Sequence, residues 1–414
     1  MGSSPASRDA GRAVDMKPLR RLVIFAVFVV LPCGDAGAHD PSSWGGLFRS
    51  RDYGARWLPV NEGRFIGSAL GVAVSPADAN HLLLATDSGL LRSRNGGRDW
   101  TTEAPTALVG GVFAVAFDVD GVRAMASTAR GLFRTDDGRT WRQASLPREA
   151  LPARAIVRGV ARGRVYLGGA DGVWQSDDWG TSWTIEVDGM PEGAVSAIVV
   201  LPGSPEKVYA VAGGRLWVRI DGARSWALGE TGMPAGRVDT VASDGEDSSR
   251  LWAVASEQLY VSDDRGTTRR SFGRPLPEPN TAVRGIAAAG SSPSIVLTTD
   301  RGLLRSVDAG RTWTLQEGML PAHLEAGPLV RDPSDPTTLY AGFALTPYDE
   351  SWRMAVEGRT MLGRLDLMTA AGGVAFLAMV ALTAALALRS LRRHYERPVV
   401  PFVSSRTRPG DSAR

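Results

Sequence analysis

One phrase recurs seven times along the chain, and this repetition constrains the fold more than any other feature of the sequence. Five copies begin with a glycine, and the other two begin with Arg215 and Gln258. Three strand-forming residues follow, and then a pattern close to Ser-x-Asp-x-Gly-x-Thr-Trp. The serine-equivalent position falls at residues 50, 93, 135, 176, 219, 262 and 306, so successive copies lie 41 to 44 residues apart. A fixed period of this length predicts a repeat architecture in which each repeat forms one supersecondary unit.

Each repeat has room for four short strands. Two runs rich in β-forming residues precede the phrase, for example GVAVSP and HLLLATD, and Gly, Pro, Asp or Ser bounds them. The phrase itself has the pattern of a third strand, a turn and a fourth strand. Four strands in about 42 residues match the size of one β-propeller blade.

The two ends of the repeat region are incomplete in complementary ways. The first copy lacks its two preceding strands, and the stretches PLVRDP and TLYAGFA near the other end lack a following phrase. Together they complete a seventh blade. We therefore predict an all-β fold over residues 39–345: a seven-bladed β-propeller of four-stranded antiparallel blades, closed by the N- and C-terminal strands. The competing arrangement, an open solenoid, would not produce complementary ends.

Three residue types recur at fixed places in the phrase. A short carboxylate or amide can accept hydrogen bonds from the following backbone amides where the chain reverses, and it stands at Asp52, Asn95, Asp137, Asp178, Asp221, Asp264 and Asp308. A glycine that follows shortly supplies the positive φ of a tight turn. Six copies end in a tryptophan that we expect to wedge between neighbouring blades: Trp57, Trp100, Trp141, Trp183, Trp226 and Trp313.

Some copies depart from the phrase. Arg219 and Ala223 replace the serine and the glycine of the fifth copy, and Arg269 replaces the tryptophan of the sixth. The third copy is one residue shorter than the others. We expect these blades to be less regular.

Residues 1–38 have the pattern of an N-terminal extension followed by a secretory signal peptide. Basic residues precede an apolar run at 22–31, and the small residues at 36–38 resemble a cleavage site. Ten apolar residues are too few to cross a bilayer as a helix. The start of translation is open between Met1 and Met16.

A second apolar run, 367–388, contains 22 residues without a charge, which is long enough to cross the ~30 Å hydrocarbon core of a membrane. The arginine-rich residues 389–414 follow directly, so the positive-inside rule predicts a cytoplasmic tail. Residues 346–366 then form a juxtamembrane stalk. This topology predicts a single-pass protein of the cytoplasmic (inner) membrane, with the propeller in the periplasm or outside the cell.

The repeated phrase resembles the Asp-box, also called the bacterial neuraminidase repeat, over about residues 44–345. Asp-boxes occur in sialidases, xyloglucan-cleaving hydrolases, sortilin-like receptors and the photosystem II assembly-factor propellers, so the resemblance implies a fold and not an activity. Seven uninterrupted repeats and an export signal make the chain most similar to the assembly-factor group. That group does not generally carry a C-terminal membrane helix, so the run at 367–388 is a departure from it.

Composition excludes several classes of function. The net charge of +3 comes from the two ends, because residues 39–345 carry 35 acidic and 32 basic side chains. The propeller therefore has no net basic charge of the kind that nucleic acid binding requires, and we predict no nucleic acid partner. Cys33 is the only cysteine and the four histidines are scattered, so we predict neither a metal site nor another cofactor.

Two tests bear on enzymatic activity. The Arg-Ile-Pro signature of sialidases is absent, and the nearest string is Arg64-Phe65-Ile66. Paired acids from loops could still form a glycosidase site, and the candidates are Asp118 with Asp120, and Asp244 with Glu246 and Asp247. The alternative interpretation is that these acids only form turns. Short blades leave no long insertions to wall a substrate cleft, which argues against an enzyme.

Arginine recurs at two places in the phrase. It precedes the serine position at Arg49, Arg92, Arg134 and Arg305, and it lies within the turn at Arg98, Arg139, Arg224 and Arg311. On one rim these side chains would form a band of guanidinium donors for acidic protein surfaces. The alternative is that their stems cover outer strands while the charged heads stay in water.

Two functional hypotheses follow. The first is a membrane-anchored extracytoplasmic propeller that acts as a protein-binding scaffold, or as an assembly or stability factor for a membrane or exported complex. The second is a carbohydrate-active glycoside hydrolase of the Asp-box class.

Overall fold

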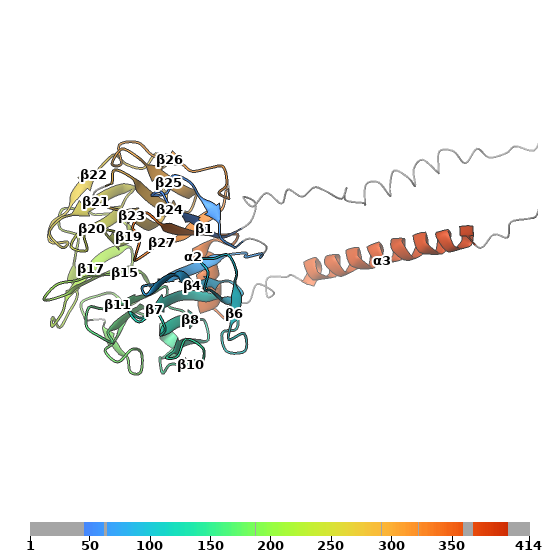
Figure 1. Cartoon of the computed structure of the whole chain (residues 1–414), viewed down its shortest axis with the longest axis horizontal. Helices are drawn as coiled ribbons and strands as arrows, with labels where there is room; N and C mark the ends of the chain where they lie inside the picture. The colour runs from blue at the N-terminus through green and yellow to red at the C-terminus, as the bar shows by residue number, and fades with distance from the viewer. Residues whose placement is uncertain are drawn as a thin grey trace, which may run out of the picture. The chain divides into compact units, whose positions relative to one another are not determined.

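The computed structural model describes residues 45–358, apart from 62, 63, 187, 291 and 322, together with a helix at 367–395 (Figure 1). The chain forms two compact units, Met1–Trp352 and Arg353–Arg414. The predicted signal peptide and residues 396–414 of the predicted cytoplasmic tail lie outside the described residues.

Seven four-stranded antiparallel sheets make up the first unit, which confirms the predicted all-β propeller. Blade 1 contains β3 (Ala69–Ser75), β4 (Asp78–Thr86), β5 (Gly89–Ser93) and β6 (Thr101–Glu103). Blade 2 contains β7 (Val112–Phe117), β8 (Ala124–Thr128), β9 (Gly131–Thr135) and β10 (Trp141–Gln143). Blade 3 contains β11 (Ala155–Arg158), β12 (Val165–Gly168), β13 (Val173–Ser176) and β14 (Thr184–Glu186).

The next three blades repeat this order. Blade 4 contains β15 (Val195–Leu201), β16 (Lys207–Ala212), β17 (Arg215–Ile220) and β18 (Ala227–Leu228). Blade 5 contains β19 (Val238–Ser243), β20 (Leu251–Ala255), β21 (Gln258–Ser262) and β22 (Arg270–Phe272). Blade 6 contains β23 (Val283–Ala288), β24 (Ile295–Thr299), β25 (Gly302–Ser306) and β26 (Thr314–Leu315).

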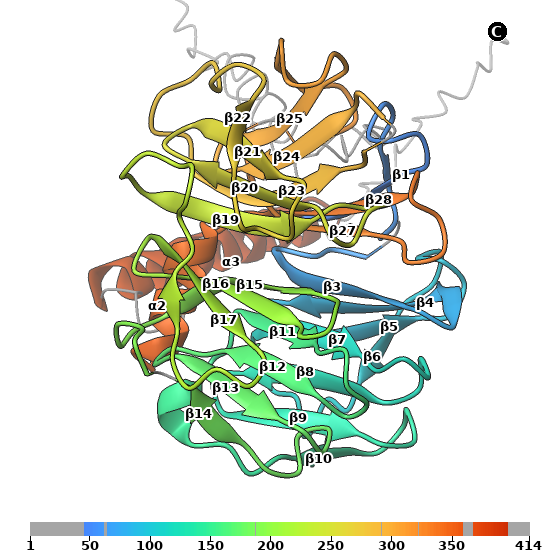
Figure 2. The ribbon, with the colours of Figure 1, turned by 90° about the vertical axis from the view of Figure 1, so that its left-hand side faces the viewer.

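Blade 7 joins the two ends of the domain. It contains β27 (Glu325–Arg331) and β28 (Leu339–Ala344) from the C-terminal end, and β1 (Gly46–Ser50) and β2 (Leu58–Pro59) from the N-terminal end. β1 pairs antiparallel with β28 over its whole length, and Figure 2 shows the blue and orange strands side by side. The predicted closure of the ring is confirmed.

The first strand of each blade lies at the centre of the ring. β3, β7, β11, β15, β19, β23 and β27 contact one another in this order, and β27 contacts β3, so the seven strands enclose a central channel. Because every blade has the same antiparallel order, the ring has two different faces. We call the face where these inner strands begin the start face. The opposite face, which carries the turns of the repeated phrase, is the turn face.

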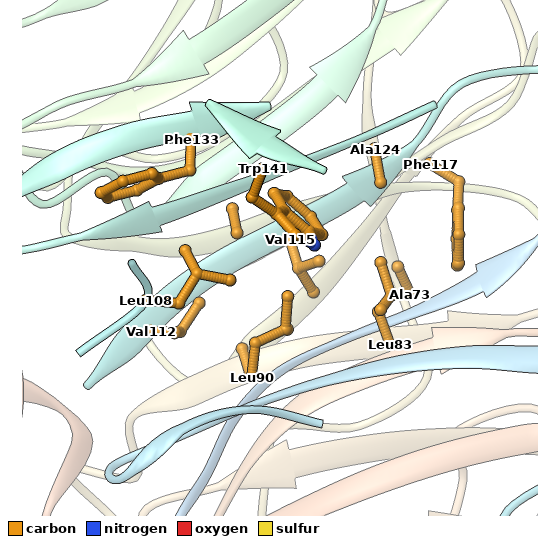
Figure 3. Packing of buried hydrophobic residues seen from close by; sticks show 12 residues of the cluster. Ala73, Leu83, Leu90, Leu108, Val112, Val115, Phe117, Ala124, Phe133 and Trp141 are labelled. Carbon is orange, nitrogen blue, oxygen red and sulfur yellow. The ribbon is translucent and has the colours of Figure 1, made fainter. Parts of the chain in front are cut away.

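Apolar side chains hold neighbouring blades together. Within the described chain the buried apolar residues form seven clusters, and each cluster joins two adjacent blades. Between blades 1 and 2, for example, Leu83 and Leu90 lie in one cluster with Val115 and Trp141 (Figure 3). Full burial of one such side chain contributes about 2 kcal/mol. The hydrophobic core is therefore distributed around the ring, between the blades.

Three helices complete the described residues. A 3₁₀ helix, η2 (Arg148–Ala150), precedes β11; α2 (Tyr348–Val356) follows β28; and α3 (Leu367–Tyr395) is 29 residues long. Among the described residues no helix has the length and apolarity that crossing a membrane requires. The membrane segment at 367–388 therefore stays a prediction from the sequence.

Candidate functional site

The turns of the repeated phrase have a self-contained hydrogen-bond pattern. In blade 7 the Ser50 hydroxyl donates to Asp52 Oδ1 (2.8 Å) and accepts the Gly54 N–H (2.8 Å). The Asp52 carboxylate also accepts the Arg56 N–H (2.9 Å), so one serine and one aspartate close the turn. The same two serine contacts recur at Ser93, Ser176, Ser262 and Ser306.

These hydrogen bonds lower the pKa of the turn carboxylates. In Asp308 the backbone N–H and the hydroxyl of Thr312 lower the pKa to about 2. In Asp264 burial raises the pKa, but hydrogen bonds from Ser262 and Thr268 outweigh burial and lower it to about 2. A carboxylate held ionised in this way suits a structural turn better than proton transfer near neutral pH.

The fifth and sixth turns differ from the others. In the fifth, Arg219 stands in the serine position and pairs with Glu186 of blade 3 (3.0 Å). In the sixth, Arg269 stands in the tryptophan position, is buried, and places its guanidinium 5.3 Å from the centre of the Tyr209 ring in blade 4. Each substituted side chain therefore contacts the preceding blade.

The tryptophans of the phrase lie between neighbouring blades. Trp57 packs in one cluster with residues of blade 6, and Trp183 packs at the junction of blades 2 and 3. The indole N–H of the other four donates to an oxygen of the preceding blade: Trp100 to Val60 O (2.7 Å), Trp141 to Glu103 Oε2 (2.9 Å), Trp226 to Glu186 O (2.9 Å) and Trp313 to Arg274 O (3.2 Å).

The arginines before the serine position bind within the ring. Three of them donate to the carbonyl of the residue after the turn aspartate or asparagine in the next blade: Arg49 to Gly96 O (2.8 Å), Arg134 to Trp179 O (2.9 Å) and Arg305 to Tyr53 O (3.3 Å). The fourth, Arg92, is buried and pairs with Glu103 (2.8 Å). These guanidinium groups link neighbouring turns or strands.

The arginines within the turns have a different environment. Arg98, Arg139, Arg224 and Arg311 are all exposed. None of the four forms an ion pair with any residue that the structure describes. Because their turns occupy equivalent places in blades 1, 2, 4 and 6, they all lie on the turn face. We call these four residues the turn-face arginines.

The first pair of candidate catalytic acids forms a turn. Asp118 is buried, accepts the Val119 N–H (2.7 Å) and pairs with Arg123. Asp120 accepts two backbone N–H groups and also pairs with Arg123 (2.8 Å). Burial raises the pKa of Asp120, but these hydrogen bonds outweigh burial and lower it. A glycosidase acid requires a raised pKa, which is the opposite arrangement.

The second group of candidate catalytic acids also forms a turn. Asp244 is buried, and its carboxylate accepts the Glu246 N–H (2.9 Å) and the indole N–H of Trp252 (2.8 Å). Hydrogen bonds from the side chain and the backbone of Ser249 lower the pKa of Asp247. The turn interpretation therefore accounts for the contacts of Asp118, Asp120, Asp244 and Asp247.

The central channel has a volume of about 570 Å³. β-bulges shape its entrance, because the register shifts near the start of six of the seven inner strands. A bulge re-aims the extra side chain. The bulged residues include Leu70, Phe113, Asp239 and Arg284, and all four line the channel. The propeller therefore presents apolar and charged side chains together at this entrance.

Residues 348–352 of α2 lie at this entrance, which we call the channel mouth. The Asp349 carboxylate pairs with Arg154 of blade 3 (2.9 Å) and Arg284 of blade 6 (3.2 Å). The Tyr348 hydroxyl donates to Ala69 O (2.7 Å). The Trp352 indole N–H donates to Pro152 O (2.9 Å), and the Arg154 guanidinium stacks 4.0 Å from the centre of its ring.

The sequence pattern predicts a stalk at residues 346–366 and gives no indication of this contact. One local signal was available: Pro347 followed by Asp349 and Glu350 is typical of a helix start. Nothing in the repeated phrase indicates where that helix would bind. Within the described residues, no group of three or more His, Cys, Asp or Glu side chains is placed to hold a metal ion.

Comparisons with known proteins identify structural neighbours. No protein-family model and no curated protein matches the sequence. The solved structure of YCF48 from Cyanidioschyzon merolae is similar at 14% identity and a TM-score of 0.51, over 67% of this chain and 96% of that one. YCF48 bound to D1 peptide is similar at 16% identity and a TM-score of 0.50, over 67% of this chain and 92% of that one.

A carbohydrate-active enzyme is equally similar. The GH74 xyloglucanase from Xanthomonas campestris gives 19% identity and a TM-score of 0.52, over 68% of this chain and 51% of the enzyme. At these identities the likeness shows a shared seven-bladed propeller and leaves the function to the residues of this chain.

Proposed function

We propose that this protein is a membrane-anchored, extracytoplasmic scaffold that binds an acidic surface of a partner protein in a membrane or exported complex. The observation that carries the proposal is the set of turn-face arginines. Arg98, Arg139, Arg224 and Arg311 are exposed at equivalent turns on one face and have no ion-pair partner within the described chain. Guanidinium groups in such an array suit bidentate contacts to carboxylates.

The repeat geometry supports a rigid binding surface. We propose that the repeated turns are Asp-boxes, and the recurring serine and aspartate hydrogen bonds agree with that assignment. The links from Arg49, Arg134 and Arg305 to the next blade hold neighbouring turns at fixed spacing. Pre-organised surfaces lose less entropy on binding. A similar propeller, YCF48, has been solved with a bound peptide, which is consistent with protein recognition by this fold.

Anchoring rests on the two termini. The signal-peptide pattern at 1–38 and the uncharged run at 367–388 support export followed by retention in the membrane. The large apolar side chains that the structure describes within α3 are exposed: Phe376, Leu377, Met379, Val380, Leu382, Leu386 and Leu388. Lipid would cover such a surface favourably. A reporter fused after Arg414 is expected to be active in the cytoplasm only, and activity outside the cytoplasm would contradict this orientation.

Partner capture tests the binding proposal. Tagged full-length protein is recovered from detergent-solubilised membranes as wild type and as Arg98→Glu/Arg139→Glu/Arg224→Glu/Arg311→Glu. A matched control reverses four exposed arginines outside the turns of the repeated phrase: Arg64, Arg130, Arg142 and Arg148.

We expect reproducible partners with the wild type and the control, and loss of at least ten-fold in recovery with the turn-face variant. Equal recovery with all three would contradict the proposal. Turnover of a glycan panel that Asp118→Ala or Asp244→Ala abolishes, with no partner captured, would favour a hydrolase instead.

A further inference from the structure

The channel mouth has the construction of a ligand site, and it lies on the face opposite the turn-face arginines. Arg154 and Arg284 come from blades that are not neighbours in the ring, and both pair with the Asp349 carboxylate. Arg284 also pairs with Glu325 of blade 7 (3.0 Å), which stays in place when α2 leaves. The bulge at the start of β23 directs Arg284 into the channel. Convergence of two guanidinium groups from separate blades fixes a single place for an anionic group.

Both arginines keep unused binding capacity. The Nε–H groups of Arg154 and Arg284 are buried and have no hydrogen-bond partner among the described residues. A buried N–H group without an acceptor costs free energy, because it has lost its hydrogen bonds to water. A hydrogen bond formed to such a group is stronger than the same bond in water. A ligand with an additional hydrogen-bond acceptor at the channel mouth would therefore form hydrogen bonds to these N–H groups that α2 does not form.

The present occupant of the mouth is a short peptide. Tyr348 and Trp352 lie one helical turn apart on the same face of α2, and Asp349 stands next to them. An isolated helix of 9 residues is not stable in water, so these contacts hold it in place. The Asp349 side chain is 54% exposed, so this side of the ion-pair cluster faces solvent. α2 follows the last strand, β28, and belongs to none of the seven sheets, so it can leave without opening a blade.

We propose that the channel mouth recognises a peptide segment of a partner protein that presents a carboxylate between aromatic residues, and that residues 348–352 occupy the site until such a segment displaces them. The two arginines bind the carboxylate. The backbone oxygens of Ala69 and Pro152 accept from the flanking aromatic side chains, as they do from Tyr348 and Trp352. The apolar wall of the channel, including Leu70 and Phe113, receives side chains that reach deeper than α2.

The linker between β28 and α2 determines how tightly a competing peptide must bind to displace α2. Only residues 345–347 separate β28 from α2. A short linker gives an effective concentration on the order of millimolar. A free peptide of the same sequence therefore binds the wild-type chain weakly, and it binds a chain with an emptied mouth at least ten-fold more tightly.

The test uses full-length protein in detergent and a labelled, end-blocked peptide that spans residues 345–356. Peptide binding is measured by fluorescence anisotropy to the wild type and to Tyr348→Ala/Asp349→Ala/Trp352→Ala, which empties the mouth. Two further measurements report on the carboxylate contact. One uses the emptied chain with Arg154→Ala and Arg284→Ala added. The other uses the emptied chain and a peptide in which the aspartate is replaced by asparagine.

We expect binding to the emptied chain, at least ten-fold weaker binding to the wild type, and loss of binding when either the two arginines or the peptide aspartate is removed. A cooperatively folded emptied chain that binds no peptide, or that binds it without the arginines, overturns the proposal and leaves α2 as a structural cap. If the triple variant does not fold, Asp349→Asn alone is used, and it is expected to bind the peptide more tightly than the wild type.

This site is independent of the turn-face arginines. The variant that reverses Arg98, Arg139, Arg224 and Arg311 is expected to lose partner capture and, with its mouth emptied, to keep peptide binding. Failure of either proposal is therefore visible without the other.

Discussion

The turn face and the start face of this ring use arginine in opposite ways. On the turn face the same contacts repeat from blade to blade: Arg49, Arg134 and Arg305 each reach a carbonyl in the next turn, and the turn-face arginines stand in solvent. On the start face Arg154 and Arg284 come from blades 3 and 6, which are not neighbours in the ring, and both bind Asp349. The contacts that repeat from blade to blade therefore form the scaffold, and the contacts that do not repeat form a specific site.

The largest effect is expected where the repeated scaffold holds two blades together. Trp57→Ala removes a buried side chain from the junction of blades 6 and 7. We expect a loss of about 3–5 kcal/mol in the free energy of unfolding, measured by denaturant titration. Leu228→Ala, at an exposed site on an outer strand, is the control and should change it by less than about 0.5 kcal/mol. A loss below 1 kcal/mol at Trp57 would show that the phrase tryptophans do not hold the ring.

A smaller effect is expected within a single turn. The buried Ser262 hydroxyl joins Asp264 Oδ1 (2.7 Å) to the Gly266 N–H (2.7 Å). Ser262→Ala leaves both groups without this partner, which should cost about 1–3 kcal/mol in the free energy of unfolding. The exposed Ser271→Ala serves as the matched control. Equal stability of the two variants would mean that the serine contacts are dispensable.

The start face should respond to acid through Asp349. Burial is the largest influence on this carboxyl and raises its pKa, but Arg284 and Arg154 together lower the pKa below its usual 3.8. The folded state therefore binds the proton less tightly than the unfolded state. The stabilisation is present above pH 3.8 and is lost as the pH falls through the lowered pKa.

Thermal unfolding measures this effect. The Tm difference between wild type and Asp349→Asn should be constant near neutral pH and shrink below pH 3.8. A difference that grows on acidification would contradict the assigned ion pairs.

The smallest effect on stability is expected at the turn-face arginines. Each of Arg98→Glu, Arg139→Glu, Arg224→Glu and Arg311→Glu should change the free energy of unfolding by less than about 0.5 kcal/mol, because these side chains are exposed and unpaired within the described chain. Denaturant titration of the single variants checks this. A loss above 1 kcal/mol would assign them to the scaffold and not to binding.

The sequence predicts the repeated part of this molecule well, because period and turn chemistry are local. Spacing alone predicts seven blades, and the incomplete ends predict the pairing of β1 with β28. The contact of Arg49 with Gly96 O joins residues 47 positions apart, and the phrase gives no indication of it. Three of the four arginines that precede the serine position contact the next blade in this way, and the fourth, Arg92, pairs with Glu103.

The channel mouth could not be predicted in the same way. Bulges decide that Arg284 and Asp239 enter the channel, and a bulge depends on strand register, which the sequence pattern does not specify. The docking of Tyr348 onto Ala69 O joins residues 279 positions apart and belongs to no repeat. Local patterns therefore indicate a helix near Pro347 but give no partner for it.

Site-specific photo-crosslinking tests most directly the claim that the turn face binds the partner. A photoreactive phenylalanine replaces Arg139 or Arg311 on the turn face, or Arg130 or Arg148 outside the turns, in full-length protein in intact membranes. We expect the same crosslinked partner from both turn-face positions and none from the other two. Adducts only from Arg130 and Arg148, or none at any position from protein that is folded and in the membrane, would contradict it.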